Sequence, residues 1–473
     1  MRQAFADYQS GDLDAALSLC NRFIASDQNA AQALLLSAMI AQQRRQFEQS
    51  ISLLRSAVDA DPHEPVAYKR LAMSLQMLGR PDEAIAELET AVARAPERAD
   101  AWNNLAKFLA TLGQNDAAIR VQKEYSELRS RVAAIDARFV EACRLLRTGN
   151  FADGLKAFES RLEAPDFSRL VDMPCPRWQG EALEGRSILL RCEQGLGDSL
   201  QFFRYIQAVV DRGADVTVET HRPLLRLFAA STSVRLVEFD RGVAVAQGSY
   251  DFYCPMMSLP YVFGTRLDTI PCHVPYLVAD QQQARRWSAE APEAAGLKVG
   301  LVWAGGSRPL NPAMVSVDQR RSLHFSALEC LLDIPGTVFH SLQKDAPAEQ
   351  AQAAVGSGKL IDRTDELSDF ADTAALIETL DLVISADTAV AHLAAAMNKP
   401  TWILSRFDGC WRWLENRDDS PWYPSVRLFR QIRPGDWDEV LARVRASLAA
   451  LAAARAVQAC GEVIAEEREH ERG

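Results

Sequence analysis

Apolar and polar positions along the first third of the chain repeat with a step of 34 residues. Proline recurs at Pro62 and Pro96, where it would end a helix. Two further columns hold small side chains and turn residues, namely Ala16, Ser50, Ala84 and Ala118, and Gly11, Arg45, Gly79 and Gly113. A small side chain lets two helices approach closely, and glycine accepts the positive φ of a tight turn. The pattern therefore predicts helix–turn–helix hairpins that must stack to bury their apolar faces.

This pattern resembles the tetratricopeptide repeat over residues 1–163. Residues 67–96 carry the clearest copy, and Trp102 and Leu105 fit the first-helix pattern of the next one. A fifth copy follows after a step of 36, at residues 149–158. The resemblance implies an α-solenoid whose concave face holds an extended peptide or a partner protein. A pure scaffold or a dimerisation surface is the alternative interpretation of the same array.

The first helix of the fourth copy carries side chains suited to such a concave face. They are Asn103, Asn104 and Lys107. An asparagine side chain can donate to and accept from a peptide backbone at once. These three residues are therefore candidates to bind an acceptor protein.

After the repeats, short apolar runs alternate with helical patterns. Strands are predicted at residues 187–192, 215–220, 234–239, 251–254, 298–303, 337–342, 359–362, 381–385, 400–404 and 426–429. Helices are predicted at residues 200–212, 222–230, 325–332, 370–380, 389–397 and 437–456. Strands separated by helices predict right-handed βαβ units and parallel sheets. Such sheets bind ligands beyond the carboxyl ends of their strands.

Proline- and glycine-rich stretches divide the chain into parts. We expect a repeat domain at 1–163, a linker at 164–186, an acceptor half at 187–280, a second linker at 281–297, a donor half at 298–440, and a C-terminal helix with a charged tail at 441–473. The expected fold is thus an α-solenoid followed by two facing Rossmann-like halves. The cleft between the two halves is the expected ligand site.

Composition narrows the functional classes. The net charge of −11 disfavours a nucleic-acid-binding surface, which needs a positive field. No apolar run approaches the roughly 20 residues of a membrane span, and the N-terminus carries no secretory signal pattern. The nine cysteines form no CxxC pair, which disfavours a disulfide framework or a tetrathiolate zinc site. We therefore expect a cytoplasmic protein.

A glycine-containing turn follows the first predicted strand directly, at residues 193–201. Gly195 and Gly197 let the backbone approach a ligand, and N–H groups at the start of a helix attract anions or hydroxyl oxygens. Asp198 lies in the first helical turn and is a candidate functional residue. The alternative is that its carboxylate only caps the helix.

A second motif spans residues 381–404, where an apolar strand ends in Ala-Asp-Thr and a helix of small residues begins. Asp387 and Thr388 are good N-cap residues. The N–H groups of Thr388 and Ala389 would then point above the strand, in a geometry that suits a phosphate. His392 follows in the same helix, and a capped helix with a core histidine is the alternative interpretation.

Together the two motifs resemble the heptosyltransferase-type glycosyltransferases of family 9, which have the two-domain GT-B fold. The chain is more closely similar to bacterial tetratricopeptide-repeat proteins that carry this domain. The matching stretches are residues 195–205, 299–306, 339–345, 381–404 and 411–431. The aromatic residues of the last stretch either form core or line the cleft; they are Trp411, Trp413, Trp422 and Tyr423.

The resemblance implies roles residue by residue. Asp198 would be the general base that accepts the proton of the acceptor hydroxyl, and Gln201 would lie beside it at the acceptor site. A nucleotide-sugar donor would contact Gly195, Gly197, Trp303, Gly305, Lys344, Asp387, Thr388, Ala389 and His392. Helix N–H groups and a cation would offset the charge of the leaving nucleotide, so neither a metal nor a cofactor is expected. The adjacent Asp418 and Asp419 are interpreted as a loop.

The expected function is transfer of a sugar from a nucleotide-activated donor to a hydroxyl group of a protein acceptor recruited by the repeats. Flagellin is a specific candidate acceptor, because some bacterial proteins of this build modify it. Lipopolysaccharide or another glycan is the alternative acceptor. The alternative to an enzyme is a repeat scaffold with a degenerate transferase domain, and the presence of Asp198 and of the 387–392 motif argues against it.

Overall fold

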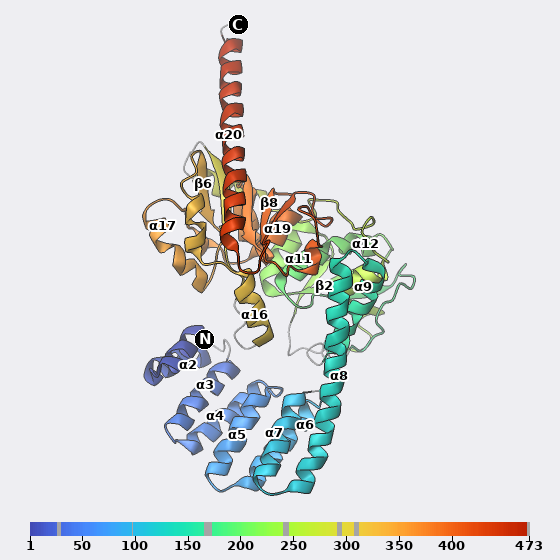
Figure 1. Ribbon diagram of the computed structural model, residues 1–473. Helices are drawn as coiled ribbons and strands as arrows, with labels where there is room; N and C mark the ends of the chain where they lie inside the picture. Colours follow the sequence, from blue (N-terminus) through green and yellow to red (C-terminus); the bar gives the residue numbers. More distant parts are fainter. Residues whose placement is uncertain are drawn as a thin grey trace. The chain divides into compact units, whose positions relative to one another are not determined.

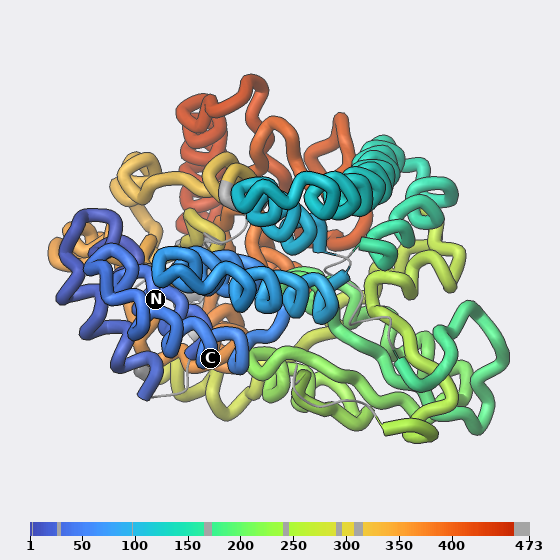
Figure 2. Tube along the Cα trace, turned by 90° about the horizontal axis from the view of Figure 1, so that it is seen from below, coloured from blue at the N-terminus to red at the C-terminus, as the bar shows by residue number. Residues whose placement is uncertain are grey.

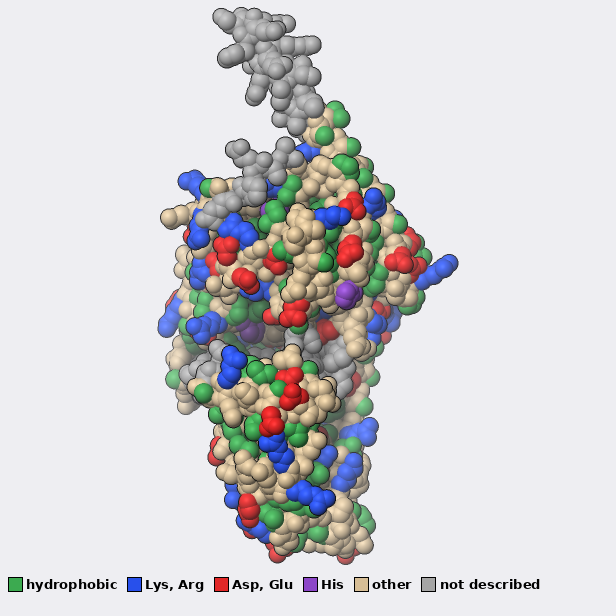
Figure 3. Space-filling model, turned by 90° about the vertical axis from the view of Figure 1, so that its left-hand side faces the viewer, with side chains coloured by type: hydrophobic (Ala, Val, Ile, Leu, Met, Phe, Trp, Pro, Cys, Tyr) green, Lys and Arg blue, Asp and Glu red, His purple; other side chains and the backbone are tan. Residues whose placement is uncertain are grey.

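The computed structural model in Figure 1 describes residues 1–25, 30–96, 98–164, 173–239, 246–290, 296–306 and 312–470. The chain forms two compact units. The first comprises Met1–Ala137 with Glu163–Asp166, and the second comprises Arg138–Leu162 with Phe167–Gly473. No helix among the described residues is long and apolar enough to cross a lipid bilayer. On the face shown in Figure 3, the acidic and basic side chains are interspersed, unlike the one-signed field that attracts nucleic acid.

The first unit is a row of antiparallel helices that follow one another in chain order (Figure 2). They are α1 (Arg2–Ser10), α2 (Leu13–Ala25), α3 (Ala30–Gln43), α4 (Phe47–Ala60), α5 (Pro65–Met77), α6 (Pro81–Arg94), α7 (Ala99–Thr111) and the start of α8 (Asn115–Arg147). Gly79 and Gly113 take positive φ at the predicted turns, and Arg45 adopts φ 57° in the same column. The predicted α-solenoid is therefore confirmed.

The column of small side chains lies where neighbouring helices meet. Ala16, Ser50 and Ala84 are fully buried. The Ser50 hydroxyl donates to the Ala38 carbonyl oxygen at 3.1 Å and accepts from Ser74 at 3.2 Å. A larger side chain in this column would push two helices apart, so the 34-residue pattern reflects packing.

The boundary between the units differs from the predicted one at residue 163. Helix α8 runs unbroken for 33 residues, and its last part belongs to the second unit together with α9 (Phe151–Phe158) and all but the last residue of the 3-10 helix η1 (Glu159–Glu163). The apolar face of α9 packs on aromatic rings of the second unit: Phe151 on Trp422 at 5.9 Å and Phe158 on Trp411 at 5.7 Å. The fifth copy therefore has the repeat sequence pattern but packs on the second unit.

The first sheet of the second unit is parallel, with strand order β3-β2-β1-β4. Its strands are β1 (Ser187–Arg191), β2 (Asp215–Thr220), β3 (Arg235–Glu238) and β4 (Phe252–Pro255). The helical segments around it are α11 (Leu196–Phe202), η3 (Phe203–Tyr205), α12 (Ile206–Val210), η4 (Arg222–Leu224), α13 (Leu225–Ser231), η5 (Met256–Ser258) and α14 (Leu259–Val262). Trp178, which lies inside the predicted linker, is fully buried in the same core, so its segment is part of the folded unit.

The second sheet is also parallel, with strand order β6-β5-β7-β8-β9. Its strands are β5 (Leu297–Val302), β6 (Thr337–Ser341), β7 (Leu382–Ala386), β8 (Thr401–Ser405) and β9 (Val426–Arg430). The helical segments are α15 (Gln281–Glu290), α16 (Pro312–Arg321), η6 (Phe325–Leu331), η7 (Ala346–Ala351), α17 (Gln352–Gly356), η8 (Thr364–Glu366), α18 (Phe370–Glu378), α19 (Ala389–Ala396), η9 (Trp411–Trp413) and α20 (Trp437–His470). Two parallel sheets flanked by helices confirm the predicted α/β architecture.

Several predicted elements of this half were wrong in detail. Residues 359–362 form one bridge, between His340 and Ile361, and not a strand. The predicted linker at 281–297 contains α15, and α16 was not predicted. The predicted helix at 325–332 is a 3-10 helix. Ile361 pairs with the edge strand β6 through a single bridge, so its segment adds no strand to the sheet.

Candidate active site

The two predicted motifs lie in direct contact. Helix α11 follows β1 and helix α19 follows β7, and the two helices pack against each other at the carboxyl ends of the two sheets. The backbone of Gly197 lies so close to α19 that an added Cβ would be 3.0 Å from Cδ2 of His392 and 3.4 Å from Cα of Ala389. Only a residue without a side chain permits this approach. The acceptor and donor motifs therefore share one interface between the two halves.

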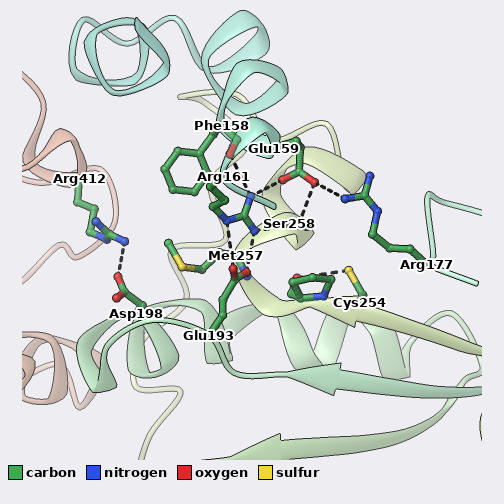
Figure 4. A network of polar contacts seen from close by, with 11 residues as sticks. Phe158, Glu159, Arg161, Arg177, Glu193, Asp198, Cys254, Met257, Ser258 and Arg412 are labelled. Atoms are coloured by element: carbon green, nitrogen blue, oxygen red, sulfur yellow. Dashed lines mark hydrogen bonds and ion pairs between the residues drawn. The ribbon is translucent and has the colours of Figure 1, made fainter. Parts of the chain in front are cut away.

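Asp198 is held at both of its carboxylate oxygens. Oδ2 accepts a hydrogen bond from the Gly195 N–H at 2.9 Å, which closes the N-terminal turn of α11. Oδ1 accepts from the guanidinium of Arg412, as Figure 4 shows. The Asp198 side chain remains 19% exposed. The carboxylate therefore caps the helix and still reaches the interface, so the two interpretations of this residue are compatible.

Arg412 is the functional candidate that sequence reasoning missed. It lies 214 residues after Asp198, in η9 beyond β8, and its side chain is only 10% exposed. Its Nε donates to Oε1 of Gln201 at 2.6 Å, and its guanidinium lies 4.7 Å from the Trp411 ring. Burial disfavours the charged guanidinium, but Asp198 and Cys410 outweigh burial and raise the pKa of Arg412 above its ordinary value. Arg412 is therefore a permanent cation at the interface.

Gln201 was predicted to contact the acceptor, but its side chain is fully buried. The side chain binds Arg412 instead, and the backbone carbonyl oxygen of Gln201 accepts from Nε of Arg204 at 2.9 Å. Arg204 in turn donates to the Trp422 carbonyl oxygen at 2.6 Å and to the Tyr276 hydroxyl at 3.0 Å. Gln201 therefore holds the two halves together, since both of its partners link α11 to the loop that follows β8.

His392 and the predicted aromatic residues form a buried cluster. The His392 ring stacks on Trp413 at 5.1 Å, and its Nδ1 lies 3.0 Å from the Tyr423 hydroxyl. Burial, together with Arg412 and Arg204, lowers the pKa of His392 well below its ordinary value. Trp411, Trp413, Trp422 and Tyr423 are all buried. The aromatic residues are thus core, and the imidazole of His392, which was predicted to contact the donor, is buried in the same cluster.

The start of α19 is built differently from the start of α11. Thr388 is the N-cap residue, but its side chain makes no capping hydrogen bond and pairs with the Ser385 hydroxyl at 3.0 Å. Asp387 and Ala389 are half-buried at this end of the helix. The first turn is therefore not capped by its own N-cap side chain, which suits the predicted phosphate contact.

The other predicted donor contacts, Trp303 and Lys344, make hydrogen bonds to backbone carbonyl oxygens of the protein. The Trp303 side chain is fully buried and donates to the Pro347 carbonyl oxygen at 3.2 Å, so it is core and not a donor contact. Nζ of Lys344 donates to the carbonyl oxygens of Thr364, at 3.3 Å, and of Leu367. The loop that follows Trp303 continues at Ser307, which lies outside the described residues.

Gly305 lies against the guanidinium of Arg321, a second cation near the site that was not predicted. A Cβ at this position would overlap the guanidinium of Arg321. Nη1 of Arg321 donates to the Asp387 carbonyl oxygen at 3.3 Å, and Nη2 pairs with Asp318 at 2.8 Å. The donor motif therefore has an arginine beside it, and this arginine comes from α16.

A buried ion-pair network binds Glu193 at the start of the turn that contains Asp198 (Figure 4). Glu193 is the first residue of this turn, residues 193–198, which we call the acceptor turn, and Arg161 of η1 binds it through two hydrogen bonds of 2.7 and 3.1 Å. The Met257 N–H donates to the same carboxylate at 3.1 Å. Arg161 also pairs with Glu159 at 2.7 Å, and Glu159 accepts from Arg177 at 3.1 Å. Because both Arg161 and Glu193 are buried, removing one partner would leave an uncompensated charge.

The predicted acceptor residues of the repeat unit lie on α7. Asn103 lines a cavity of about 380 Å³ together with Asp100, Tyr125 and Arg129. Nδ2 of Asn104 donates to the Pro65 carbonyl oxygen at 3.5 Å, so it joins two neighbouring repeats. Lys107 is exposed. Asn103 and Lys107 are thus accessible, whereas Asn104 has a structural contact.

No group of three or more His, Cys, Asp or Glu side chains in the described part of the chain is arranged to hold a metal ion. Asp419, one of the two adjacent acids, pairs with Arg417 at 2.6 Å.

Three comparisons with known proteins bear on this arrangement. Models of the tetratricopeptide repeat match residues 1–65, 39–103 and 75–128. Among solved structures, a MamA structure (MamA MSR-1 C2) is 24% identical and covers 27% of this chain and 74% of that chain, with a TM-score of 0.23. TTC0263, a thermophilic TPR protein of Thermus thermophilus, is 21% identical over 34% of this chain and 88% of that chain, with a TM-score of 0.24.

The comparisons also match the part of the chain that holds the donor motif. The model of glycosyltransferase family 9 (heptosyltransferase) matches residues 338–404. Protein FlbA of Caulobacter vibrioides is 30% identical over 342 residues, which are 67% of this chain and 55% of FlbA. The chain thus spans about half the length of this relative. These matches show that the chain joins N-terminal tetratricopeptide repeats to a C-terminal glycosyltransferase family 9 domain.

Proposed function

We propose that the chain transfers a sugar from a nucleotide-activated donor to a hydroxyl group of a protein acceptor. The observation that carries this proposal is the contact between α11 and α19. It brings Asp198 of the acceptor half to the start of the helix that follows Asp387 in the donor half. Glycosyl transfer needs a base at the attacking hydroxyl and positive charge at the leaving group, and the two motifs supply one of each.

Asp198 acts as the general base in this proposal. A sugar, serine or threonine hydroxyl is a poor nucleophile until its proton is removed, and a positioned base contributes roughly 10²–10⁴-fold to such a reaction. An ionised carboxylate offers about four lone-pair sites, and the Gly195 N–H and Arg412 occupy two of them. The remaining sites are free to accept the proton of the acceptor hydroxyl.

The donor half stabilises the leaving nucleotide. The N–H groups at the start of α19 and the Arg321 guanidinium converge near Asp387, whose carbonyl oxygen binds Arg321 at 3.3 Å. Helix N–H groups and a guanidinium both favour a phosphate. In this proposal Thr388 and Ala389 contact the diphosphate, Arg321 is the cation, and neither a metal ion nor a cofactor takes part.

The repeat unit selects the acceptor protein. On α5 the side chains of Val66, Met73 and Met77 are 44%, 44% and 65% exposed, and their spacings of seven and four residues place them on one helix face. Exposed methionines adapt to different apolar partners. Together with Asn103 and Lys107 of the next repeat, they form a surface for an acceptor such as flagellin.

The proposal is tested by assaying the purified chain with UDP-, GDP-, ADP- and CMP-activated sugars, each carrying a radiolabel, in the presence of cell extract as acceptor. We expect one donor to label a protein band, and we expect Asp198→Asn to lower the rate at least 100-fold. The matched control is Asp369→Asn. Asp369 also caps a helix and pairs with an arginine, Arg226 at 3.0 Å, but it lies outside both motifs. Full activity of Asp198→Asn would contradict the proposal.

A further inference from the structure

Arg412, in the loop that follows β8, contacts the acceptor half with its side chain. Arg412 contacts two residues on one face of α11, three positions apart: Asp198 through Nη2 and Gln201 through Nε at 2.6 Å. Its third nitrogen, Nη1, lies 3.1 Å from Sγ of Cys410. The planar guanidinium thus matches a pair of acceptors with fixed spacing, which a flexible ammonium group cannot do.

The environment of this ion pair differs from that of a surface salt bridge. The Arg412 and Asp198 side chains are 10% and 19% exposed, and the guanidinium lies near the rings of Trp411 and Phe202. Exposed ion pairs hold a carboxylate loosely, because fixing each side chain in one geometry costs entropy. Here the Gly195 N–H holds one carboxylate oxygen and Arg412 holds the other, so rotation of the carboxylate is removed.

The ion pair also joins the two halves at the point where acceptor and donor must meet. Asp198 belongs to the half built on β1–β4, whereas Arg412 belongs to the half built on β5–β9. The orientation of the carboxylate therefore depends on contact between the two halves. A base oriented in this way is in place only when the donor half lies against it.

We propose that Arg412 is the positioning residue of Asp198: it orients the carboxylate toward the acceptor hydroxyl and makes that orientation depend on contact between the two halves. This inference rests on the proposed function, since it takes Asp198 as the base. Arg412 acts through Asp198 and does not contact the donor. Its loss therefore lowers kcat and leaves the KM for the donor unchanged.

The test is a double-mutant cycle in the full chain, with the labelled nucleotide sugar that supports transfer by the wild type. We expect Arg412→Gln to lower kcat about 10- to 100-fold and to change the donor KM less than about threefold. In the Asp198→Asn background, the same substitution should change kcat less than about threefold, because the group it positions is absent. The kcat of Arg412→Lys should stay below about a tenth of the wild-type kcat, since lysine cannot bind both acceptors.

Gln201→Met provides a second test if Arg412→Gln does not fold. Gln201→Met removes only the second acceptor of the guanidinium, and it should lower kcat several-fold in the wild type but not in Asp198→Asn. Arg226→Gln is the matched control, because Arg226 also joins the two halves by pairing with a helix-capping aspartate, Asp369. It should leave kcat unchanged.

The outcomes separate the two ideas. If Asp198→Asn lowers kcat at least 100-fold but Arg412→Gln and Gln201→Met lower the residual kcat of Asp198→Asn by the same factors as in the wild type, the positioning role is overturned and the proposed function stands. If Asp198→Asn retains full activity, the proposed function falls and the positioning role falls with it. A rise in donor KM on Arg412→Gln would show that Arg412 contacts the donor, which also overturns the positioning role.

Discussion

The two turns that meet at the candidate active site are held in different ways. The acceptor turn at 193–198 is held by distant segments, because Arg161 of η1 binds Glu193 at its start and Arg412 of the donor half binds Asp198 at its end. The donor turn at 386–389 is held mainly by its own sequence neighbours, as the hydrogen bond between Ser385 and Thr388 shows. Within the described ranges, the donor turn has one long-range polar contact to a side chain, from Arg321 to the Asp387 carbonyl oxygen, whereas both ends of the acceptor turn are bound by buried arginines from distant segments. The position of the acceptor turn therefore depends more strongly on the assembly of the second unit.

The largest expected effect is on folding, and it depends on where a deletion of the repeats ends. Deleting residues 1–137 keeps α9 and η1, and we expect the remaining unit to fold and to bind nucleotide. Deleting residues 1–163 removes Arg161 and leaves Glu193 as an uncompensated buried charge, together with exposed rings such as Trp411 and Trp422. We expect this shorter chain to be insoluble or unfolded, as measured by yield and circular dichroism. Equal folding of both deletions would show that the acceptor turn does not need η1.

Gly197→Ala tests the contact between the two turns. The new Cβ would lie 3.0 Å from His392 and 3.4 Å from the backbone of Ala389, so the halves must move apart. We expect transfer to fall about 10- to 100-fold, because a small displacement of reacting groups is costly. The control is Gly356→Ala, where a Cβ would meet no atom within 4 Å. Equal transfer rates for the two variants would show that transfer does not require the close contact between α11 and α19 at Gly197.

Arg321→Gln tests whether the donor turn works as a local phosphate site. Removing the guanidinium beside the Asp387 carbonyl oxygen should weaken binding of UDP, GDP, ADP or CMP, whichever the wild type binds, about tenfold. Titration calorimetry measures this affinity, and Arg226→Gln is the control. A tenfold loss of kcat at unchanged affinity would instead place Arg321 at the transition state only.

The smallest expected effect concerns pH and the stability of the donor half. Burial, together with Lys298 and Arg363, lowers the pKa of His340 on β6 from 6.5 to about 4. The unfolded chain therefore binds the proton more tightly, and the stability due to the neutral ring is complete above pH 6.5 and lost as the pH falls toward 4. Lowering the pH from 7 to 5.5 should therefore reduce the free energy of unfolding by about 1 kcal/mol through this group.

Urea denaturation followed by tryptophan fluorescence measures that change. In His340→Gln the difference in unfolding free energy between pH 7 and 5.5 should be smaller by about 1 kcal/mol than in the wild type. The pKa of His392 is lowered in the same direction, but His392 remains in both proteins, so it does not affect the difference. An unchanged pH dependence would mean that His340 is accessible to protons in the folded state.

Much of the molecule follows from its sequence. The 34-residue step predicts the hairpins, because small side chains at helix contacts and turn residues at the loops are local requirements that the chain repeats. Nine of the ten predicted strands form, and both motif turns lie at the carboxyl ends of their strands, since alternation and capping are also local. Asp198, Thr388 and the turn glycines could be named for the same reason.

Tertiary structure alone decided which groups face one another. The fifth copy has the sequence of a repeat, but its apolar face packs on Trp411 and Trp422, and no periodicity reveals that choice of partner. Arg161, Arg321 and Arg412 look like ordinary surface arginines along the chain. Their roles arise because the fold buries Arg161 and Arg412, and half-buries Arg321, beside specific carboxylates and carbonyl oxygens up to 214 residues away in the sequence. Burial and long-range pairing set the energy of a charge, and both are properties of the folded chain.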